Sequence, residues 1–395
     1  MITVEEAKKI ISRTIPNGNS ARVSLQKAVG RILAEDIVSP IDTPPFTSSA
    51  MDGYAVCHGD TPACLKVVAC VAAGDIPKQP LQKGEAVRIM TGAMVPANAT
   101  AIVPQEEVVK EGENKIFISR KIRPGEHIRR QGEEFKTGDL ALSKGTLLTP
   151  GGIGMIASLG IHEVSVFAPP RIFIFSTGSE LVSDAREIKP GKIFESNSFA
   201  LQAALQDLHI EAKQTPPIVD TKKALRESLR KAEEESDFVF ISGGVSVGSF
   251  DFVKEVLTEM EVETLFWGIA QKPGKPLFFG KRNRRFFFGL PGNPASTLVC
   301  YYEYLRPAIL KWMGYETVEP LSEKGRLKEN FFKKTGRVHF VRAIAQRNEK
   351  GLSVSPLSGQ ESHRMNSFAT ANCLMVVPKE TERLQPGEEV TIHWI

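Results

Sequence analysis

The chain has 395 residues, a formal net charge of +4 and 42% hydrophobic residues. This length suggests more than one domain, and the composition is ordinary for globular proteins. The small net charge gives no reason to expect a nucleic-acid partner. No apolar stretch approaches the roughly 20 residues of a membrane span, and the acidic N-terminus lacks a signal-peptide pattern. With five cysteines and no C-x-x-C pair, these features predict a cytoplasmic protein with no membrane contact and reduced, mostly buried thiols.

The first part of the chain predicts helices interrupted by a β domain. Thr3 and Glu6 form a capping box that opens a short amphipathic helix, and Ser24 is a candidate cap for a second helix. Short β-like runs then alternate with Gly, Pro and Asn turns before a helical pattern resumes. We predict a helical linking domain formed by residues 1–41 together with residues 138–168. We predict an inserted all-β domain formed by residues 42–137.

The second half of the chain predicts an α/β domain followed by more β structure. Strand and helix patterns alternate from residue 169, and Asp220 is a candidate cap for one of the helices. Such alternation is typical of a parallel sheet with helices on both faces. Beyond about Gly314 the strands are separated only by turns. We therefore predict a multidomain α/β plus β protein, with a parallel-sheet α/β domain of residues 169–316 and a small C-terminal β domain of residues 317–395.

Three glycine- and proline-rich loops in the α/β domain each follow an apolar run that predicts a strand. They span residues 242–251, 272–276 and 290–296. In open α/β sheets, ligands bind in the crevice outside the carboxyl ends of the strands. Glycines there let backbone amides approach an anion, and prolines keep the loops rigid. The sequence therefore predicts one anionic-ligand site built from three strand ends.

The three loops differ in how strongly their sequences indicate ligand binding rather than a purely structural role. Lys272 and Lys275 stand on a loop that two prolines stiffen, which a solvated turn would not need. Residues 242–251 supply amides, hydroxyls and Asp251 at the start of a helix. Helix initiation is a sufficient explanation of Pro294, so a structural role and an anion-binding role both stay open for Ser296. Glu180 follows the first strand of the domain, where it could ligate Mg²⁺ through oxygen.

The motifs of the inserted domain are only suggestive by themselves. Residues 49–55 form a loop-like segment with one acid, Asp52, for which a surface turn is the simpler interpretation. Residues 88–92 and 129–134 contain Thr91 and Glu134 in similar settings. The seven histidines show no metal-ligand spacing.

Taken together, the order and spacing of these segments resemble the molybdopterin molybdenumtransferase family, which includes MoeA-like proteins and the E domain of gephyrin. The resemblance covers essentially the whole chain, including residues 359–363 and 371–373 near its end. It implies four domains, an elongated homodimer and a cleft shared between subunits. It also implies Mg²⁺-dependent transfer of molybdenum from molybdate to adenylylated molybdopterin, with release of AMP, and a transient contact with a molybdopterin adenylyltransferase.

The resemblance also assigns roles to residues of this sequence. The implied catalytic residues are Asp52, Thr91, Glu134, Glu180 and Asp251, with Glu180 and Asp251 as the Mg²⁺ ligands. The implied substrate-binding residues are Gly243, Gly244, Ser246, Lys272, Lys275, Pro291, Pro294, Ser296, Arg342 and Ser362. Asp220 matches a family acid near the cleft, a role with which helix capping competes. The chain departs from the family pattern at Thr47 and Glu134, where the family usually has an acid and an aspartate.

Two alternatives stay open at this point. Molybdopterin adenylyltransferases share the α/β domain, but they carry a Gly-Gly-Thr-Gly loop where this chain has Val245 after Gly244, and they lack the flanking domains. A protein of the same fold that serves only as a scaffold is the second alternative. Retention of Asp52, Asp251 and both lysines argues against it.

Overall fold

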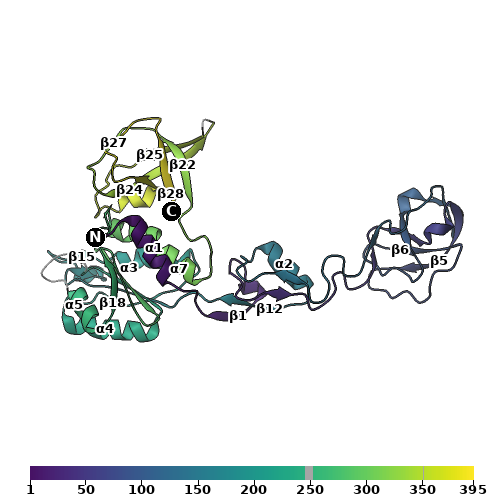
Figure 1. The fold of residues 1–395 in the computed structure, drawn as a ribbon, viewed down its shortest axis with the longest axis horizontal. Helices are drawn as coiled ribbons and strands as arrows, with labels where there is room; N and C mark the ends of the chain where they lie inside the picture. Colours follow the sequence, from purple (N-terminus) through teal and green to yellow (C-terminus); the bar gives the residue numbers. More distant parts are fainter. Residues whose placement is uncertain (245–251, 350) are drawn as a thin grey trace. The chain divides into compact units, whose positions relative to one another are not determined.

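The computed structural model describes residues 1–244, 252–349 and 351–395, which form two compact units (Figure 1). One unit combines Met1–Ala21 with Phe167–Ile395, and the other is Arg22–Val166. Asp251 and Ser246, both predicted site residues, lie outside the described residues. Among the described helices, none is long and apolar enough to cross a membrane.

The larger unit is built on a six-stranded sheet. Its strands, in spatial order, are β16 (Lys213–Gln214), β13 (Ile172–Ser176), β17 (Phe238–Ser242), β21 (Arg285–Leu290), β20 (Phe278–Arg282) and β18 (Glu263–Trp267). β20 is antiparallel to both of its neighbours, so the sheet is mixed rather than wholly parallel as predicted. β18 nevertheless has the same direction as β17 and β21. The carboxyl ends of these three strands therefore meet at one edge.

Helices cover both faces of this sheet, because its strands are apolar on both sides. Phe238 and Phe240 pack on one face, whereas Val239 and Ile241 pack on the other. The first face carries α1 (Val4–Thr14), α3 (Asn197–Gln206), α6 (Pro294–Cys300) and α7 (Arg306–Trp312), and the second carries α4 (Lys222–Glu235) and α5 (Phe252–Glu259). This three-layer packing is the predicted α/β arrangement. The capping box of α1 is also confirmed, with hydrogen bonds of 2.8 and 3.1 Å between Thr3 and Glu6.

The C-terminal β structure is a small barrel. Its strands are β22 (Ser322–Leu327), β24 (Val338–Asn348), β25 (Gly351–Pro356), β26 (Cys373–Val377) and β28 (Glu389–Trp394). β24 pairs with both β25 and β26, and this double pairing closes the ring. A short strand from the α/β domain, β19 (Gln271–Lys272), pairs in parallel with β24. This pairing attaches the loop of residues 272–276, called the lysine loop below, to the barrel.

The smaller unit contains the predicted inserted β structure. Its main sheet has the order β7 (Ala101–Pro104), β4 (Gly53–Val56), β6 (Glu85–Ile89), β5 (Ala63–Val71), β9 (Lys115–Ile118) and β8 (Val109–Lys110). A helix, α2 (Pro150–Ser158), follows the cap Thr149, whose hydroxyl accepts from the Gly152 amide.

Two expectations about local structure and cysteines were wrong. Ser24 caps no helix and is followed only by the single 3₁₀ turn Leu25–Lys27. The backbone there pairs with distant segments instead: the Leu25 amide donates to the His162 carbonyl at 3.1 Å, so tertiary pairing overrides helical propensity. The cysteines are all free, but only Cys300 and Cys373 are buried.

Candidate functional site

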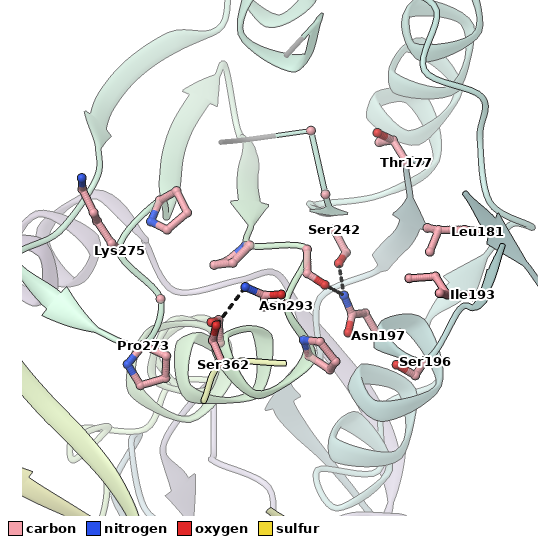
Figure 2. Close-up of a pocket in the computed structure, with 18 of the residues that line it drawn as sticks. Thr177, Leu181, Ile193, Ser196, Asn197, Ser242, Pro273, Lys275, Asn293 and Ser362 are labelled. Atoms are coloured by element: carbon pink, nitrogen blue, oxygen red, sulfur yellow. Dashed lines mark hydrogen bonds between the residues drawn. The ribbon is translucent and has the colours of Figure 1, made fainter. Parts of the chain in front are cut away.

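A cavity of about 620 Å³ lies at the shared carboxyl edge of the α/β sheet (Figure 2). Residues that follow β13, β17 and β21 line it, together with the loop that carries the two lysines. The start of α3 and the loop around Ser362 complete the wall. The predicted convergence of three strand-end loops on one site is therefore present in the structure.

Close backbone packing explains the glycine that follows β17. Gly243 has a φ of 88°, and a Cβ there would lie 2.5 Å from the Thr177 carbonyl oxygen. Its amide donates to the Leu290 carbonyl at 3.1 Å, which joins the ends of β17 and β21. A side chain at this position would be strained and would separate the two strand ends.

The lysine loop is held from behind by a buried side chain. Gln271 is fully buried; its amide nitrogen donates to the Pro273 carbonyl at 3.0 Å, and its amide oxygen accepts from the Tyr304 hydroxyl. Gly274 has a φ of 90°, and a Cβ there would lie 2.6 Å from Gln271 Nε2. Lys272 and Lys275 both line the cavity (Figure 2 labels Lys275). The loop therefore places two cations with little freedom left to lose.

The cavity lining also contains carboxylates. Asp220 accepts from the Thr177 hydroxyl at 2.6 Å and from the Ser179 amide at 3.3 Å. The prediction that Asp220 caps the following helix was wrong, because Thr221 is the N-cap of α4. Asp220 and Glu180 both line the cavity. Carboxylate oxygens suit Mg²⁺, although the described residues contain no group of three or more His, Cys, Asp or Glu placed to hold a metal ion.

Asn197, at the start of α3, is a lining residue that the sequence analysis missed. Its amide nitrogen donates to Ser242 Oγ at 2.7 Å and to the Gly292 carbonyl at 2.8 Å (Figure 2). These bonds fix the orientation of the amide, and its Oδ1 is buried without a hydrogen-bond partner among the described residues. A buried acceptor without a partner costs about 1–3 kcal/mol. A ligand N–H group would remove that cost.

The C-terminal domain contributes Ser362 directly and Arg342 indirectly. Asn293 donates to Ser362 Oγ at 2.9 Å, and the Ala295 amide donates to the Ser362 carbonyl at 3.1 Å. Arg342 is fully buried and does not line the cavity. Its guanidinium donates to the Gly359 carbonyl at 2.8 Å and to the Glu361 carbonyl at 3.2 Å, and burial lowers its pKa. The structure thus places Arg342 behind the loop that presents Ser362.

Most predicted residues of the larger unit line this one cavity. They are Glu180, Gly243, Gly244, Lys272, Lys275, Pro291, Pro294, Ser296 and Ser362. Arg337 and Gln360 line it too and were missed. Arg337 stood in no segment that the sequence singled out, whereas Gln360 lies within residues 359–363 of the family resemblance, where no role was assigned to it.

The predicted residues Asp52, Thr91 and Glu134 belong to the other unit. Asp52 Oδ1 accepts from the Thr91 hydroxyl at 2.7 Å and from the Thr91 amide at 2.6 Å. These two bonds hold the pKa of Asp52 below its ordinary value and keep it ionised. Glu134 is exposed, and its amide donates to the Thr43 carbonyl at 3.0 Å.

An α/β sheet with a glycine- and lysine-lined cavity at its strand ends, together with a β-barrel, is typical of a multidomain protein that binds its ligand at the strand ends. Family models match nearly the whole chain: the MoeA N-terminal region (domains I and II) at residues 2–160, a probable molybdopterin binding domain at residues 173–311, and the MoeA C-terminal region (domain IV) at residues 324–395. The chain belongs to the MoeA family of molybdopterin molybdenumtransferases.

Full-length relatives agree with this assignment. The chain is 38% identical to a molybdopterin molybdenumtransferase of Haemophilus influenzae, covering 100% of this chain and 98% of the relative. It is 32% identical to one of Staphylococcus epidermidis, covering 99% and 95%. Among solved structures, it is similar to a molybdopterin biosynthesis MoeA protein from Pyrococcus horikoshii, with a TM-score of 0.86, 34% identity and coverage of 100% and 99%.

Proposed function

We propose that this protein catalyses Mg²⁺-dependent insertion of molybdenum from molybdate into adenylylated molybdopterin, with release of AMP. The observation that carries the proposal is the single cavity that combines backbone amides, two lysines on a stiffened loop and the carboxylates of Glu180, Glu195 and Asp220. Both substrates are anionic, which suits the lysines and amides. An adenylyltransferase or a non-catalytic scaffold of the same fold binds no molybdate. Neither would need the two positive charges of Lys272 and Lys275 on a stiffened loop.

Each side of the cavity has its own role in this proposal. Lys272 and Lys275 hold the molybdate oxyanion or the phosphate of the pterin. The amides of Gly243 and Gly244 approach the anionic part of the substrate. The unpartnered Oδ1 of Asn197 accepts a hydrogen bond from an N–H group of the pterin ring. The pterin would then be recognised by a neutral contact and its phosphate by charge.

Mg²⁺ would be held by Glu180, together with Asp251. The fit rests on the carboxylate oxygens that the cavity presents, since Glu180 and Asp220 both line it. When bound, Mg²⁺ neutralises charge on the phosphoanhydride oxygens. Without it, carboxylates beside a phosphoanhydride would repel the substrate. The chain's own contribution is to keep these carboxylates close to the anion-binding loops.

The ionised Asp52 with Thr91, and Glu134, complete the site in this proposal. They belong to the inserted domain, and we propose that a homodimer supplies them from the second subunit. Asp52 is kept ionised by two hydrogen bonds from Thr91, so it is ready to take a proton or a metal ion. A transient complex with a molybdopterin adenylyltransferase would deliver the labile substrate.

The test is incubation of the purified protein with adenylylated molybdopterin, Mg²⁺ and molybdate, followed by measurement of AMP release. We expect AMP release that requires both molybdate and Mg²⁺. Formation of adenylylated product from ATP and molybdopterin without molybdate would support the adenylyltransferase alternative. A failure of the purified protein to bind molybdopterin would support a scaffold role.

A further inference from the structure

The two central carbonyls of the lysine loop accept hydrogen bonds from buried side chains. Gln271 Nε2 donates to the Pro273 carbonyl at 3.0 Å and to the Gly274 carbonyl at 3.4 Å. The Cys300 thiol, which burial keeps protonated by raising its pKa, also donates to the Gly274 carbonyl, at 3.8 Å. Gln271 and Cys300 are both fully buried. Because carbonyl oxygens repel an anion, these bonds engage two groups that would otherwise oppose binding.

The hydroxyl of Tyr304 decides which way the Gln271 amide faces. An amide side chain has two orientations, which exchange its oxygen and its nitrogen. In the reverse orientation, Oε1 of Gln271 would face the two loop carbonyls, and these have no proton to donate. The Tyr304 hydroxyl donates to Oε1 and so favours the observed orientation. Burial raises the pKa of Tyr304 well above its ordinary value, so the hydroxyl stays a donor.

Tyr304 belongs to a short π-helical segment, Tyr301–Leu305, which lies between α6 and α7. Such segments inside helices are frequent at functional sites. The preceding residue, Glu303, is fully buried and pairs with Lys8 of α1 at 2.5 Å and with His393 of β28 at 2.7 Å. The Lys8 ammonium also lies 6.0 Å from the centre of the Tyr304 ring. The segment is therefore anchored on two other elements, and its tyrosine is held where it meets the lysine loop.

We propose that Tyr304 and Gln271 are positioning residues for the reaction, acting as a relay behind the lysine loop. The Tyr304 hydroxyl fixes the Gln271 amide, and the amide draws the two central carbonyls of the loop toward the core. The two lysines are then the groups that the loop presents to an anion. Tyr304 does not line the cavity, so it acts on a ligand only through Gln271. An effect on molybdate rests on the proposed function, whereas the hold on the loop does not.

Tyr301 provides a matched control in the same π-helical segment. It is as deeply buried as Tyr304, and its hydroxyl donates to the Ala204 carbonyl of α3 at 2.6 Å. Replacing either tyrosine by phenylalanine therefore removes one buried hydrogen bond and leaves one oxygen acceptor without it. Only the bond of Tyr304 leads to the lysine loop.

The first measurement is backbone hydrogen exchange of residues 268–277 in the full-length protein without substrate. Two backbone bonds close the base of the lysine loop: the Gly268 amide donates to the Leu277 carbonyl and the Ile269 amide to the Lys275 carbonyl, both at 2.8 Å. We expect Tyr304→Phe to speed exchange of these two amides at least about tenfold, because the loop opens more often. Tyr301→Phe should leave them at the wild-type rate. Equal exchange in the two variants would overturn the relay.

A double-variant cycle separates the relay from a general loss of packing. Gln271→Met removes the amide and keeps a long side chain, so nothing is left for Tyr304 to orient. We expect Gln271→Met to speed exchange of the same two amides, and Tyr304→Phe to add less than about twofold in that background. Full addition of the two effects would show independent action and refute the relay. If Gln271→Met does not fold, the comparison of the two tyrosine variants decides alone.

Turnover separates this inference from the proposed function. We expect Tyr304→Phe to raise the half-saturating molybdate concentration about tenfold and to keep the maximal rate, because the ordered loop is less populated. Tyr301→Phe should keep both values. A loosened loop with an unchanged half-saturating concentration would overturn the positioning role. A loosened loop in a protein without molybdenumtransferase activity would refute the proposed function and leave the hold on the loop standing. Normal activity with equal exchange in both tyrosine variants would do the reverse.

Discussion

The α/β strand ends and the Asp52 turn of the inserted domain present their functional groups in different ways. At the strand ends, lysines, amides and carboxylates from several loops line one cavity, and the buried side chain of Gln271 holds the loop that carries the lysines. In the inserted domain, Asp52 and Thr91 form one exposed pair on the surface of a β domain. Under the proposed function, we expect the first region to bind the ligand and the second to contribute to the chemistry. We therefore expect mutations to affect binding and chemistry separately.

The largest effect is expected at Asp52. Asp52→Asn removes an ionised carboxylate and keeps the size of the side chain. We expect AMP release to slow at least about a hundredfold, in the range of a lost acid–base group, while substrate binding is retained. Single-turnover AMP release and equilibrium binding measure the two separately. Asp75→Asn is the matched control, because Asp75 is also an exposed turn carboxylate of this domain and accepts only from the Ala72 amide at 3.0 Å. Equal turnover in Asp52→Asn and wild type would remove Asp52 from the mechanism.

A mixture of variants tests whether the two regions act across a dimer. Asp52→Asn and Lys275→Met would each inactivate or weaken one half of the site. Heterodimers of the two would contain one intact site. At a molybdate concentration far below the half-saturating value of Lys275→Met, random exchange should therefore give about a quarter of the wild-type activity at that concentration. Activity is measured before and after exchange, with heterodimers verified by mass. No gain after verified exchange would contradict a shared site.

A smaller effect is expected at the lysines. Lys272→Met and Lys275→Met each remove one charge contact with the oxyanion, which we expect to be worth about 1–3 kcal/mol. The half-saturating molybdate concentration should rise at least about tenfold. Lys281→Met is the control, because Lys281 lies on β20 and pairs with Glu263 at 3.3 Å, away from the cavity lining. Molybdate dependence within twofold of wild type in both variants would show that these lysines do not hold the oxyanion.

The smallest effect concerns the pKa of Asp52. The Thr91 bonds lower that pKa, so the carboxylate stays ionised as the pH falls until its lowered pKa is reached. Thr91→Val removes the hydroxyl bond, and the pKa should rise toward the ordinary Asp value of about 3.9. The acidic limb of kcat/KM should then move to higher pH, whereas Thr91→Ser, which keeps the hydroxyl, should retain the wild-type profile. If the acidic limb of kcat/KM were the same in Thr91→Val and Thr91→Ser, the Thr91 hydroxyl would not set the pKa of Asp52.

Sequence reasoning succeeded where local pattern decides the structure. The strand-to-loop transitions at Gly243 and Lys272 were visible because apolar runs end in Gly and Pro. Prediction from the sequence failed where contacts between residues far apart in the sequence determine the structure. Ser24 looks like a helix cap, but pairing of the neighbouring backbone with the segment near His162 prevents the helix. Asn197 carries no local signal, because its role depends on Ser242 and Gly292, both far away in the sequence.

The antiparallel strand β20 was missed for a related reason. β20 and β21 pair as a hairpin, with Asn283 at a φ of 55° in the turn between them. Alternation of strands and helices says nothing about a strand added inside the sheet by such a hairpin. The direction of β18 was preserved, so the predicted site at one edge survived the error.

The pairing of β19 with β24 has a consequence for how the protein can be divided. The strand that carries Lys272 comes from the α/β domain, yet within the described part of the chain it pairs only with a strand of the barrel. Truncation after Trp312 would leave every residue of the lysine loop in the chain and remove the template that sets its conformation. An isolated α/β fragment would then report the affinity of an untethered loop. The barrel is accordingly part of the affinity of the cleft, even for a ligand that touches none of its side chains.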